Sequence, residues 1–309
     1  HWEKWKAEGK DTTMCIVDFA EIMPFEWDTM VYLDYHSYSR EEDDVKEYMD
    51  DITYGNIVHE VVERIYTEMK GQPITTKELD ILANNSDDYL KKQITIVINK
   101  HYNRLGDNNT TPIYGEAEVL ADIMLYTLKR LFEVEKTVAP IHFKSAEERV
   151  TLSYQVNDNL KVNFIQFIDR VDTATVNGKN QLRIVDYKTG GNPDTPRSID
   201  SLFVRDKNRS GHIFQTFLYA SIMCKLSQMK IAPSLLYIHR AASDDYSPII
   251  KIKEDKVAEE VTDFIIHEDK FREMLQELLE EIFNPDIPFT QTEVEDKCTY
   301  CDFKAMCKK

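Results

Sequence analysis

At 309 residues, the chain is long enough for one large domain or two smaller ones with a sizeable hydrophobic core. Its formal net charge of −17 argues against a protein that coats nucleic acid by bulk electrostatic attraction, because phosphate binding depends on Lys and Arg. The sequence has no apolar run of membrane-spanning length and no signal-peptide pattern at its start. We therefore expect a soluble, cytoplasmic protein with no membrane partner.

The segment before Thr53 shows no clear pattern, and helical signals dominate from there to about residue 145. Three helical segments are expected: one from Thr53 to near Gly71, one that opens with the capping-box pair Thr75 and Glu78 and reaches His101 with a break near Asn84-Asn85, and one from Glu116 to about Glu135. These helices form a region inserted before the predicted sheet.

Apolar and β-branched residues then predict strands at Arg149–Val156, Val162–Thr175, Gln181–Tyr187, Ser234–His239 and Ile249–Ile252. Asn177-Gly178 is typical of a type I′ turn, so the second and third strands should pair as an antiparallel hairpin. Further helices are expected at Gly211–Ser227, Lys256–Phe271 and Glu273–Phe283. The pattern indicates an α/β fold.

We divide the chain into four parts. An N-terminal segment (1–52) is expected to pack with the C-terminal tail, and a helical region (53–145) follows it. The sheet-containing core covers 146–255. The last part (256–309) carries helices and a cluster of cysteines.

Charged residues interrupt the central pair of strands, in Ile168-Asp169-Arg170-Val171-Asp172 and in Asp186-Tyr187-Lys188-Thr189-Gly190. Side chains alternate along a strand, so Asp186 and Lys188 should point to the same face. With Asp169 beside them, they would form an oxygen-rich cation site with a lysine at its edge, which suits metal-assisted phosphodiester hydrolysis. An internal Asp–Lys ion pair is the structural alternative, because isolated charges are costly to bury.

Two more segments accompany these strands in a fixed order. Tyr54-Gly55-Asn56-Ile57-Val58-His59-Glu60-Val61-Val62-Glu63 comes first and Gln215-Thr216-Phe217-Leu218-Tyr219 comes last. In this order the four segments resemble the nuclease domain of the RecB/AddB-type helicase-nucleases, a branch of the PD-(D/E)XK superfamily. The resemblance implies a restriction-endonuclease-like core with a central mixed sheet flanked by helices, a helical insertion and a C-terminal cysteine tail.

The resemblance also implies roles for individual residues. The metal ligands are expected to be His59, Asp169, Asp186 and the backbone carbonyl of Tyr187. Lys188 corresponds to the catalytic lysine, which acts with Asp169 and Asp186 on the attacking water and the phosphate charge.

Contacts to DNA are expected for Gln215, Tyr219 and Arg170. Gln215 and Tyr219 are one helical turn apart and share a helix face. Glu148, at the start of the first predicted strand, fits a solvated charge better than an accessory carboxylate.

Three cysteines crowd the C-terminus: Cys298, Cys301 and Cys307. In many members of this branch, such a trio joins an N-terminal cysteine to hold a 4Fe-4S cluster. Here Met23 stands where that cysteine is expected, and Cys15 lies upstream of it. Three alternatives remain open: a 4Fe-4S cluster that uses Cys15, a zinc site, or a trio without a metal.

These features predict a DNA exonuclease of the RecB/AddB type that depends on Mg²⁺ or Mn²⁺ and serves DNA repair or recombination. Its DNA is expected to be single-stranded or to have free ends, and a helicase domain or subunit is an expected partner. Two other classes of function remain open: a catalytically silent nuclease-like module, structural or DNA-binding, within a helicase-nuclease assembly, and a metal-binding protein organised by its cysteines.

Overall fold

One long strand, β3 (Leu160–Val176), organises the computed structural model of the chain. The structure describes residues 14–17, 49–158, 160–205, 209–241, 246–254, 257–288, 292, 298–299, 301 and 304. β3 pairs with three other strands, so it forms the centre of the sheet.

The sheet is mixed. β2 (His142–Asn157) runs antiparallel to β3 along nearly all of its length. On the other edge of β3, β1 (Met14–Val17) pairs in parallel with the first half, and β4 (Lys179–Lys188) pairs in the antiparallel direction with the second half. β5 (Ile231–Tyr237) adds in parallel to β4. The mixed sheet was predicted, whereas β1 is a strand that the sequence pattern did not reveal.

A tight turn joins β3 to β4. Asn177 and Gly178 have φ angles of 47° and 74°, both in the left-handed region, as a type I′ turn requires. Glycine enters this region without a Cβ penalty, and asparagine tolerates it better than most residues. The predicted antiparallel hairpin is therefore confirmed.

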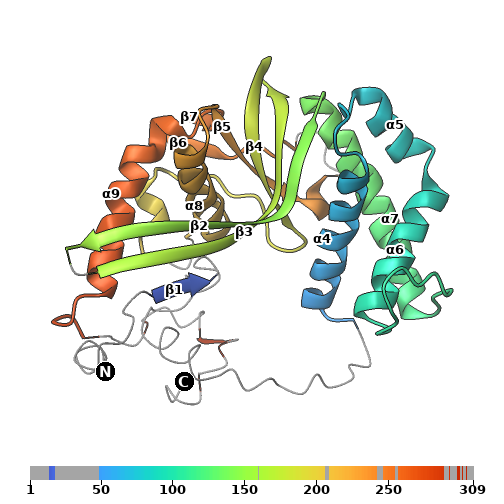
Figure 1. Ribbon diagram of the computed structural model, residues 1–309, viewed down its shortest axis with the longest axis horizontal. Helices are drawn as coiled ribbons and strands as arrows, with labels where there is room; N and C mark the ends of the chain where they lie inside the picture. The colour runs from blue at the N-terminus through green and yellow to red at the C-terminus, as the bar shows by residue number, and fades with distance from the viewer. Residues whose placement is uncertain are drawn as a thin grey trace.

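Helices cover both faces of the sheet (Figure 1). One side carries α4 (Asp51–Glu68), α5 (Thr76–Asn84), α6 (Asp87–His101) and α7 (Glu116–Glu135), and the other carries α8 (Gly211–Leu226) and α9 (Ile265–Ile282). Short 3₁₀ helices lie at η1 (Lys136–Val138), η2 (Asp200–Leu202) and η3 (Ile238–Arg240). The predicted capping box opens α5, because the backbone N–H of Thr75 donates to Glu78 and the Thr75 side chain accepts in return.

Alternation along β4 directs its buried side chains into the two large hydrophobic clusters of the interior. Leu182 and Ile184 pack into the cluster under α8 and α9, whereas Val185 and Tyr187 pack into the cluster under α4 to α7. Both faces of this strand are therefore buried, which explains its nearly continuous apolar sequence.

The C-terminal helical pair was predicted wrongly. Residues 257–260 form the strand β7 (Val257–Glu260), which pairs antiparallel with β6 (Lys251–Glu254). α9 then runs from Ile265 to Ile282 without a break at Arg272-Glu273. Its buried residues, Phe271, Leu275 and Leu279, recur at helical spacing across the predicted break and keep one face against the core.

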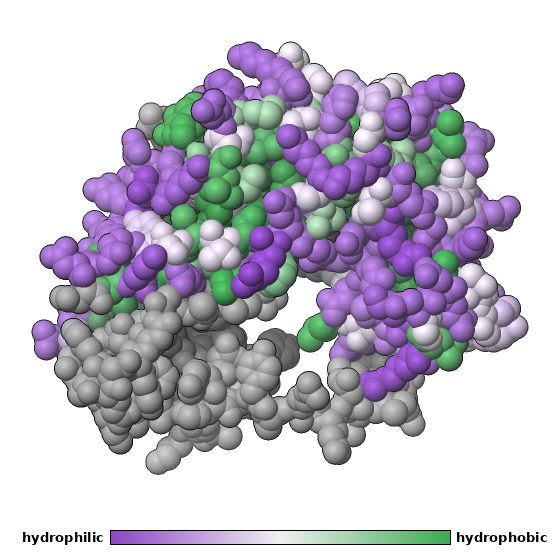
Figure 2. Space-filling model, in the orientation of Figure 1, coloured by the Kyte–Doolittle hydropathy of each residue, from purple (hydrophilic) through white to green (hydrophobic). Residues whose placement is uncertain are grey.

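The expected packing of segment 1–52 against the C-terminal tail rests largely on residues outside the described part of the chain, and Cys307 lies outside it as well. None of the helices in the described part of the chain has the length and apolarity that crossing a membrane requires. Figure 2 shows hydrophilic side chains over most of the side formed by α5 to α7, in keeping with the high proportion of charged residues.

Replacing Phe271 with alanine should lower the free energy of unfolding by about 3–5 kcal/mol, because the buried ring packs against four other aromatic rings and its loss leaves a cavity. Ile266→Ala, on the same helix but 76% exposed, should change it by about 0.5 kcal/mol or less. Urea denaturation measures both, and equal effects would contradict the assigned core.

Candidate functional site

The site lies where β3 and β4 stop pairing. The β3–β4 ladder ends at the pair Arg170 and Val185, and Asp169 and Asp186 are the next residues along the two strands. Beyond this point the Asp169 side chain replaces the ladder, because its Oδ2 accepts a hydrogen bond of 2.7 Å from the backbone N–H of Tyr187. The Tyr187 carbonyl oxygen lies 3.1 Å from His59 Nε2. One residue, Tyr187, thus joins strand β4 to Asp169 and to helix α4 through its backbone.

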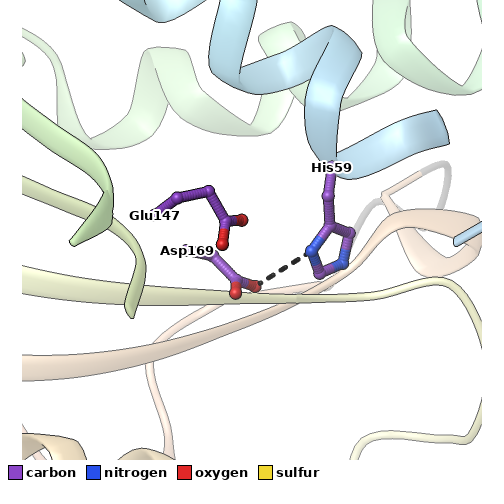
Figure 3. Close-up of side chains that lie close together, drawn as sticks. All are labelled: His59, Glu147 and Asp169. Carbon is purple, nitrogen blue, oxygen red and sulfur yellow. Dashed lines mark ion pairs between the residues drawn. The ribbon is translucent and has the colours of Figure 1, made fainter. Parts of the chain in front are cut away.

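His59, Glu147 and Asp169 point toward one another from α4, β2 and β3 (Figure 3). One ligand atom from each lies within 4.8 Å of the others, and His59 Nδ1 is 3.6 Å from Asp169 Oδ2. With its proton on Nε2, the imidazole donates to the Tyr187 carbonyl and presents the Nδ1 lone pair to the carboxylates. An imidazole and two carboxylates form a donor set that suits a divalent cation.

Glu147 is held in an unusual backbone conformation. Its φ angle is 47°, in the left-handed region that residues other than glycine seldom occupy. The ladder pairs Ala146 with Arg170 and Glu148 with Ile168, so Glu147 stands opposite Asp169. Glu147 is exposed as a residue, yet partial burial of its carboxyl group and the neighbouring charge of Asp169 raise its pKa to about 7. A cation at this position would offset the repulsion between the two carboxylates.

Glu147 was not among the predicted site residues, whereas its neighbour Glu148 was weighed as an accessory carboxylate. In the structure Glu148 lies within β2 rather than at its start, is exposed, and accepts a hydrogen bond from the hydroxyl of Ser145. The predicted strand began only at Arg149, whereas β2 begins at His142. An earlier strand start would have placed two consecutive glutamates on opposite faces and directed attention to one of them.

Burial lowers the pKa of His59, so its neutral form is favoured near pH 7. A neutral imidazole is the form that binds a metal ion. The nearby charges of Asp186 and Glu147 act in the opposite direction but do not outweigh burial.

Asp186 and Lys188 face α8. Lys188 Nζ lies 2.9 Å from Asp186 Oδ2 and donates to Gln215 Oε1 at 2.9 Å, and Gln215 Nε2 donates to the Tyr219 hydroxyl at 2.7 Å. Asp186 is 1% exposed, and its Oδ2 receives no well-aligned hydrogen bond from the described residues. Asp186 is outside the 4.8 Å group, although its charge influences both His59 and Glu147. Because Lys188 Nζ contacts Asp186 Oδ2, the two side chains share the orientation that was predicted for them.

Three residues expected to contact DNA lie in the interior. Gln215 and Tyr219 are 8% and 2% exposed and lie behind Lys188, where they hold its ammonium group. Arg170 is 1% exposed, and its guanidinium contacts Glu135 and Asp172. The structure thus places these side chains under the site rather than on its surface.

His212 is a second residue near the site that was not among the predicted site residues. Its Nδ1 lies 3.0 Å from the Tyr237 hydroxyl, and burial together with the charge of Lys188 lowers its pKa. Gly191, with a φ of 76°, passes so close that a Cβ there would lie 2.9 Å from the His212 ring. Glycine at 191 is therefore needed for the loop after Lys188 to pack on this histidine.

The predicted cysteine cluster falls largely outside the described side chains. The backbone of Cys15 lies in β1, opposite Asn163, and Cys298 and Cys301 are not in disulfides. The three alternatives for this cluster remain predictions.

Comparison with known proteins decides the family. The sequence profile of the PD-(D/E)XK nuclease superfamily matches residues 30–308. The chain belongs to this superfamily. The resemblance drawn from the four sequence segments is confirmed, and the mixed sheet flanked by helices agrees with the fold expected of a PD-(D/E)XK protein.

Curated relatives of this PD-(D/E)XK protein include three that are named as subunits of an ATP-dependent helicase/deoxyribonuclease, from Clostridium perfringens strains SM101, ATCC 13124 and 13. Each is 24% identical to the chain over 235 residues, which cover 72% of the chain and 19% of the relative. The chain therefore matches about a fifth of the length of these relatives.

Glu147→Gln should raise the melting temperature in metal-free buffer above pH 7. The folded protein holds the Glu147 pKa at about 7, above the ordinary value of 4.5, so ionising Glu147 opposes folding. This penalty is absent below pH 4.5 and complete above pH 7, so the gain should shrink as the pH falls toward 5. Glu148→Gln is the control, and an equal pH-dependent gain there would contradict the assignment. Calorimetry across this pH range measures both.

Proposed function

We propose that this PD-(D/E)XK protein is a deoxyribonuclease that hydrolyses phosphodiester bonds with the help of Mg²⁺ or Mn²⁺. The observation that carries the proposal is the junction at the Tyr187 backbone. On one side of it lies the group of His59, Glu147 and Asp169, and on the other lies the ion pair of Asp186 and Lys188. Ligands for a cation and a lysine for the phosphate therefore meet where β3 and β4 stop pairing.

The residues present fit a divalent cation. His59, Asp169 and Glu147 supply converging ligand atoms, and we assign Asp186 and the Tyr187 carbonyl as further oxygen ligands. When bound, such a cation supplies Lewis-acid charge at the scissile phosphate and makes a nearby water more acidic. The raised pKa of Glu147 supports this assignment, because like-charged carboxylates are gathered there at a cost that a cation removes.

Lys188 is assigned to the phosphate and the attacking water. Its ammonium group is held between Asp186 Oδ2 and Gln215 Oε1, and the Tyr219 hydroxyl fixes the Gln215 amide in turn. A cation fixed in this way stabilises negative charge that develops on the phosphoryl oxygens without first reorganising. We therefore assign Gln215 and Tyr219 to the orientation of Lys188.

We further propose that the activity is exonucleolytic on DNA that is single-stranded or has free ends, in repair or recombination. The support is the likeness to relatives named helicase/deoxyribonuclease subunits. The net charge of −17 also favours a nuclease domain that receives DNA from a helicase partner instead of capturing it by bulk attraction.

The purified protein should cleave linear DNA only when Mg²⁺ or Mn²⁺ is present and should leave circular single-stranded DNA intact. Lys188→Ala should lower the rate by about 100-fold or more, because it removes charge stabilisation in the transition state. Lys91→Ala, at an exposed ion pair with Asp122, should leave the rate unchanged. Gel analysis of end-labelled substrates measures the rates.

Unchanged cleavage by Lys188→Ala would assign the activity to a contaminant or another site. Absence of cleavage by the unchanged protein on all substrates would favour the silent module of a helicase-nuclease assembly. Cleavage of the circle would make the enzyme an endonuclease.

Glu147→Gln should weaken Mn²⁺ binding by at least about tenfold, because even partners of metal ligands contribute this much to affinity. Glu148→Gln should bind Mn²⁺ as the unchanged protein does, since this side chain lies outside the group of ligands. Isothermal titration calorimetry gives both affinities. An equal effect of the two substitutions would exclude Glu147 as a specific ligand.

A further inference from the structure

Four charged side chains lie together in the interior behind the site: Glu135, Arg170, Asp172 and Arg183, which we call the buried ion network. Each is 1% exposed or less. Arg183 forms paired hydrogen bonds with Glu135, at 3.0 and 2.8 Å, and with Asp172, at 3.0 and 2.8 Å. Arg170 Nη2 lies 2.8 Å from Glu135 Oε2, and Arg170 Nε lies 3.0 Å from Asp172 Oδ2. The network has equal numbers of positive and negative groups.

Stability alone is a weak reason for this arrangement. Four charges removed from water carry a large desolvation penalty, and apolar residues of similar volume often stabilise a protein as well or better. Burial raises the pKa of Glu135, but the charges of Arg170 and Arg183 outweigh it and lower the pKa, so the carboxylate stays ionised. The free energy of folding alone is therefore a poor account of the network.

The position of Arg170 supplies a further reason. Arg170 follows Asp169 directly in β3, and its guanidinium lies 4.2 Å from the ring centre of Tyr66 and 5.4 Å from that of Tyr187. Cations attract aromatic faces at such distances. The same Tyr187 provides the backbone groups that bind Asp169 Oδ2 and contact His59 Nε2. Arg170 is therefore joined to Asp169 by the peptide bond and contacts Tyr187 through the aromatic ring of that tyrosine.

We propose that Glu135 and Arg170 form a positioning pair: together they hold Asp169 and the Tyr187 backbone in the geometry that binds the cation. This inference rests on the proposed function. Glu135, near the end of α7, anchors the guanidinium through its Oε2. The anchored guanidinium fixes the backbone at Asp169 and the ring of Tyr187. Neither residue touches the cation, so both act through the ligands that they hold.

The other half of the network offers a matched control. Asp172 and Arg183 are directly paired across β3 and β4, two residues further from the site than Arg170 and Val185. Removing this pair takes away one charge of each sign and leaves the contact between Glu135 and Arg170. Removing Glu135 and Arg170 instead leaves Asp172 and Arg183 paired.

The experiment compares two double variants, Glu135→Gln with Arg170→Met and Asp172→Asn with Arg183→Met. Both keep the interior neutral and remove the same charges. We expect Mn²⁺ affinity, measured by isothermal titration calorimetry, to fall by about tenfold only in the first, the size expected for partners of metal ligands. Urea denaturation of both variants reports whether stability has changed equally. Equal loss of affinity in the two folded variants, or loss in neither, would overturn the proposal.

A second pair of variants serves if a double variant does not fold. Tyr66→Leu removes the aromatic face over Arg170 together with the hydroxyl that donates to Glu135 Oε2 at 3.3 Å. Tyr66→Phe keeps the aromatic face and removes only the hydroxyl, and Arg170 and Arg183 still bind Glu135 in this variant. We expect weaker Mn²⁺ binding in the leucine variant and unchanged binding in the phenylalanine variant, and equal affinities would again overturn the proposal. Absence of Mn²⁺ binding by the unchanged protein would instead contradict the proposed function and remove the basis of this inference with it.

Discussion

The hydrogen bond from the Tyr187 N–H to Asp169 is the contact on which the arrangement of the site depends. It forms where β3 and β4 separate, so a side-chain carboxylate takes over from the backbone ladder. Without it, a buried N–H would lack an acceptor and Asp169 would lose its fixed position. The carbonyl oxygen of Tyr187 lies 3.1 Å from His59 Nε2, and this contact links helix α4 to the same residue.

The alternation of side chains along β4 places neighbouring site residues on opposite faces of the sheet. The Tyr187 ring is directed to the α4 side, whereas Asp186 and Lys188 are directed to α8. Three consecutive residues therefore serve two helical layers that are far apart in sequence. The lysine is oriented by one layer and the His59 imidazole is supplied by the other.

Much of this architecture could be predicted from local pattern. The turn at Asn177-Gly178, the capping box at Thr75 and the shared orientation of Asp186 and Lys188 follow from short-range rules, and the structure shows all three. Their physical causes lie within a few residues of the chain, so a single sequence carries enough information to identify them.

The missed features depend on contacts between distant segments. Glu147 became prominent only when β2 set it opposite Asp169, and Arg170 looked like a basic DNA contact until α7 supplied Glu135 as its partner. The continuity of α9 likewise depends on Phe271 and Leu275 packing against the core on both sides of the expected break. Local spacing gives no signal for the pairing of Glu147 with Asp169 or of Arg170 with Glu135, whereas the helical spacing of Phe271 and Leu275 does continue across the expected break.

The division of β3 and β4 between two hydrophobic clusters has a consequence for cooperativity. Val171 and Ile184 pack in one cluster, while Ala174 and Val185 pack in the other. Both helical layers therefore pack against the same two strands. If one layer unfolds, it exposes strands that the other layer also needs for its packing. A fragment that lacks either layer would expose one face of these strands and weaken the packing of the remaining layer. The site and the whole sheet are therefore expected to fold and unfold as one cooperative unit.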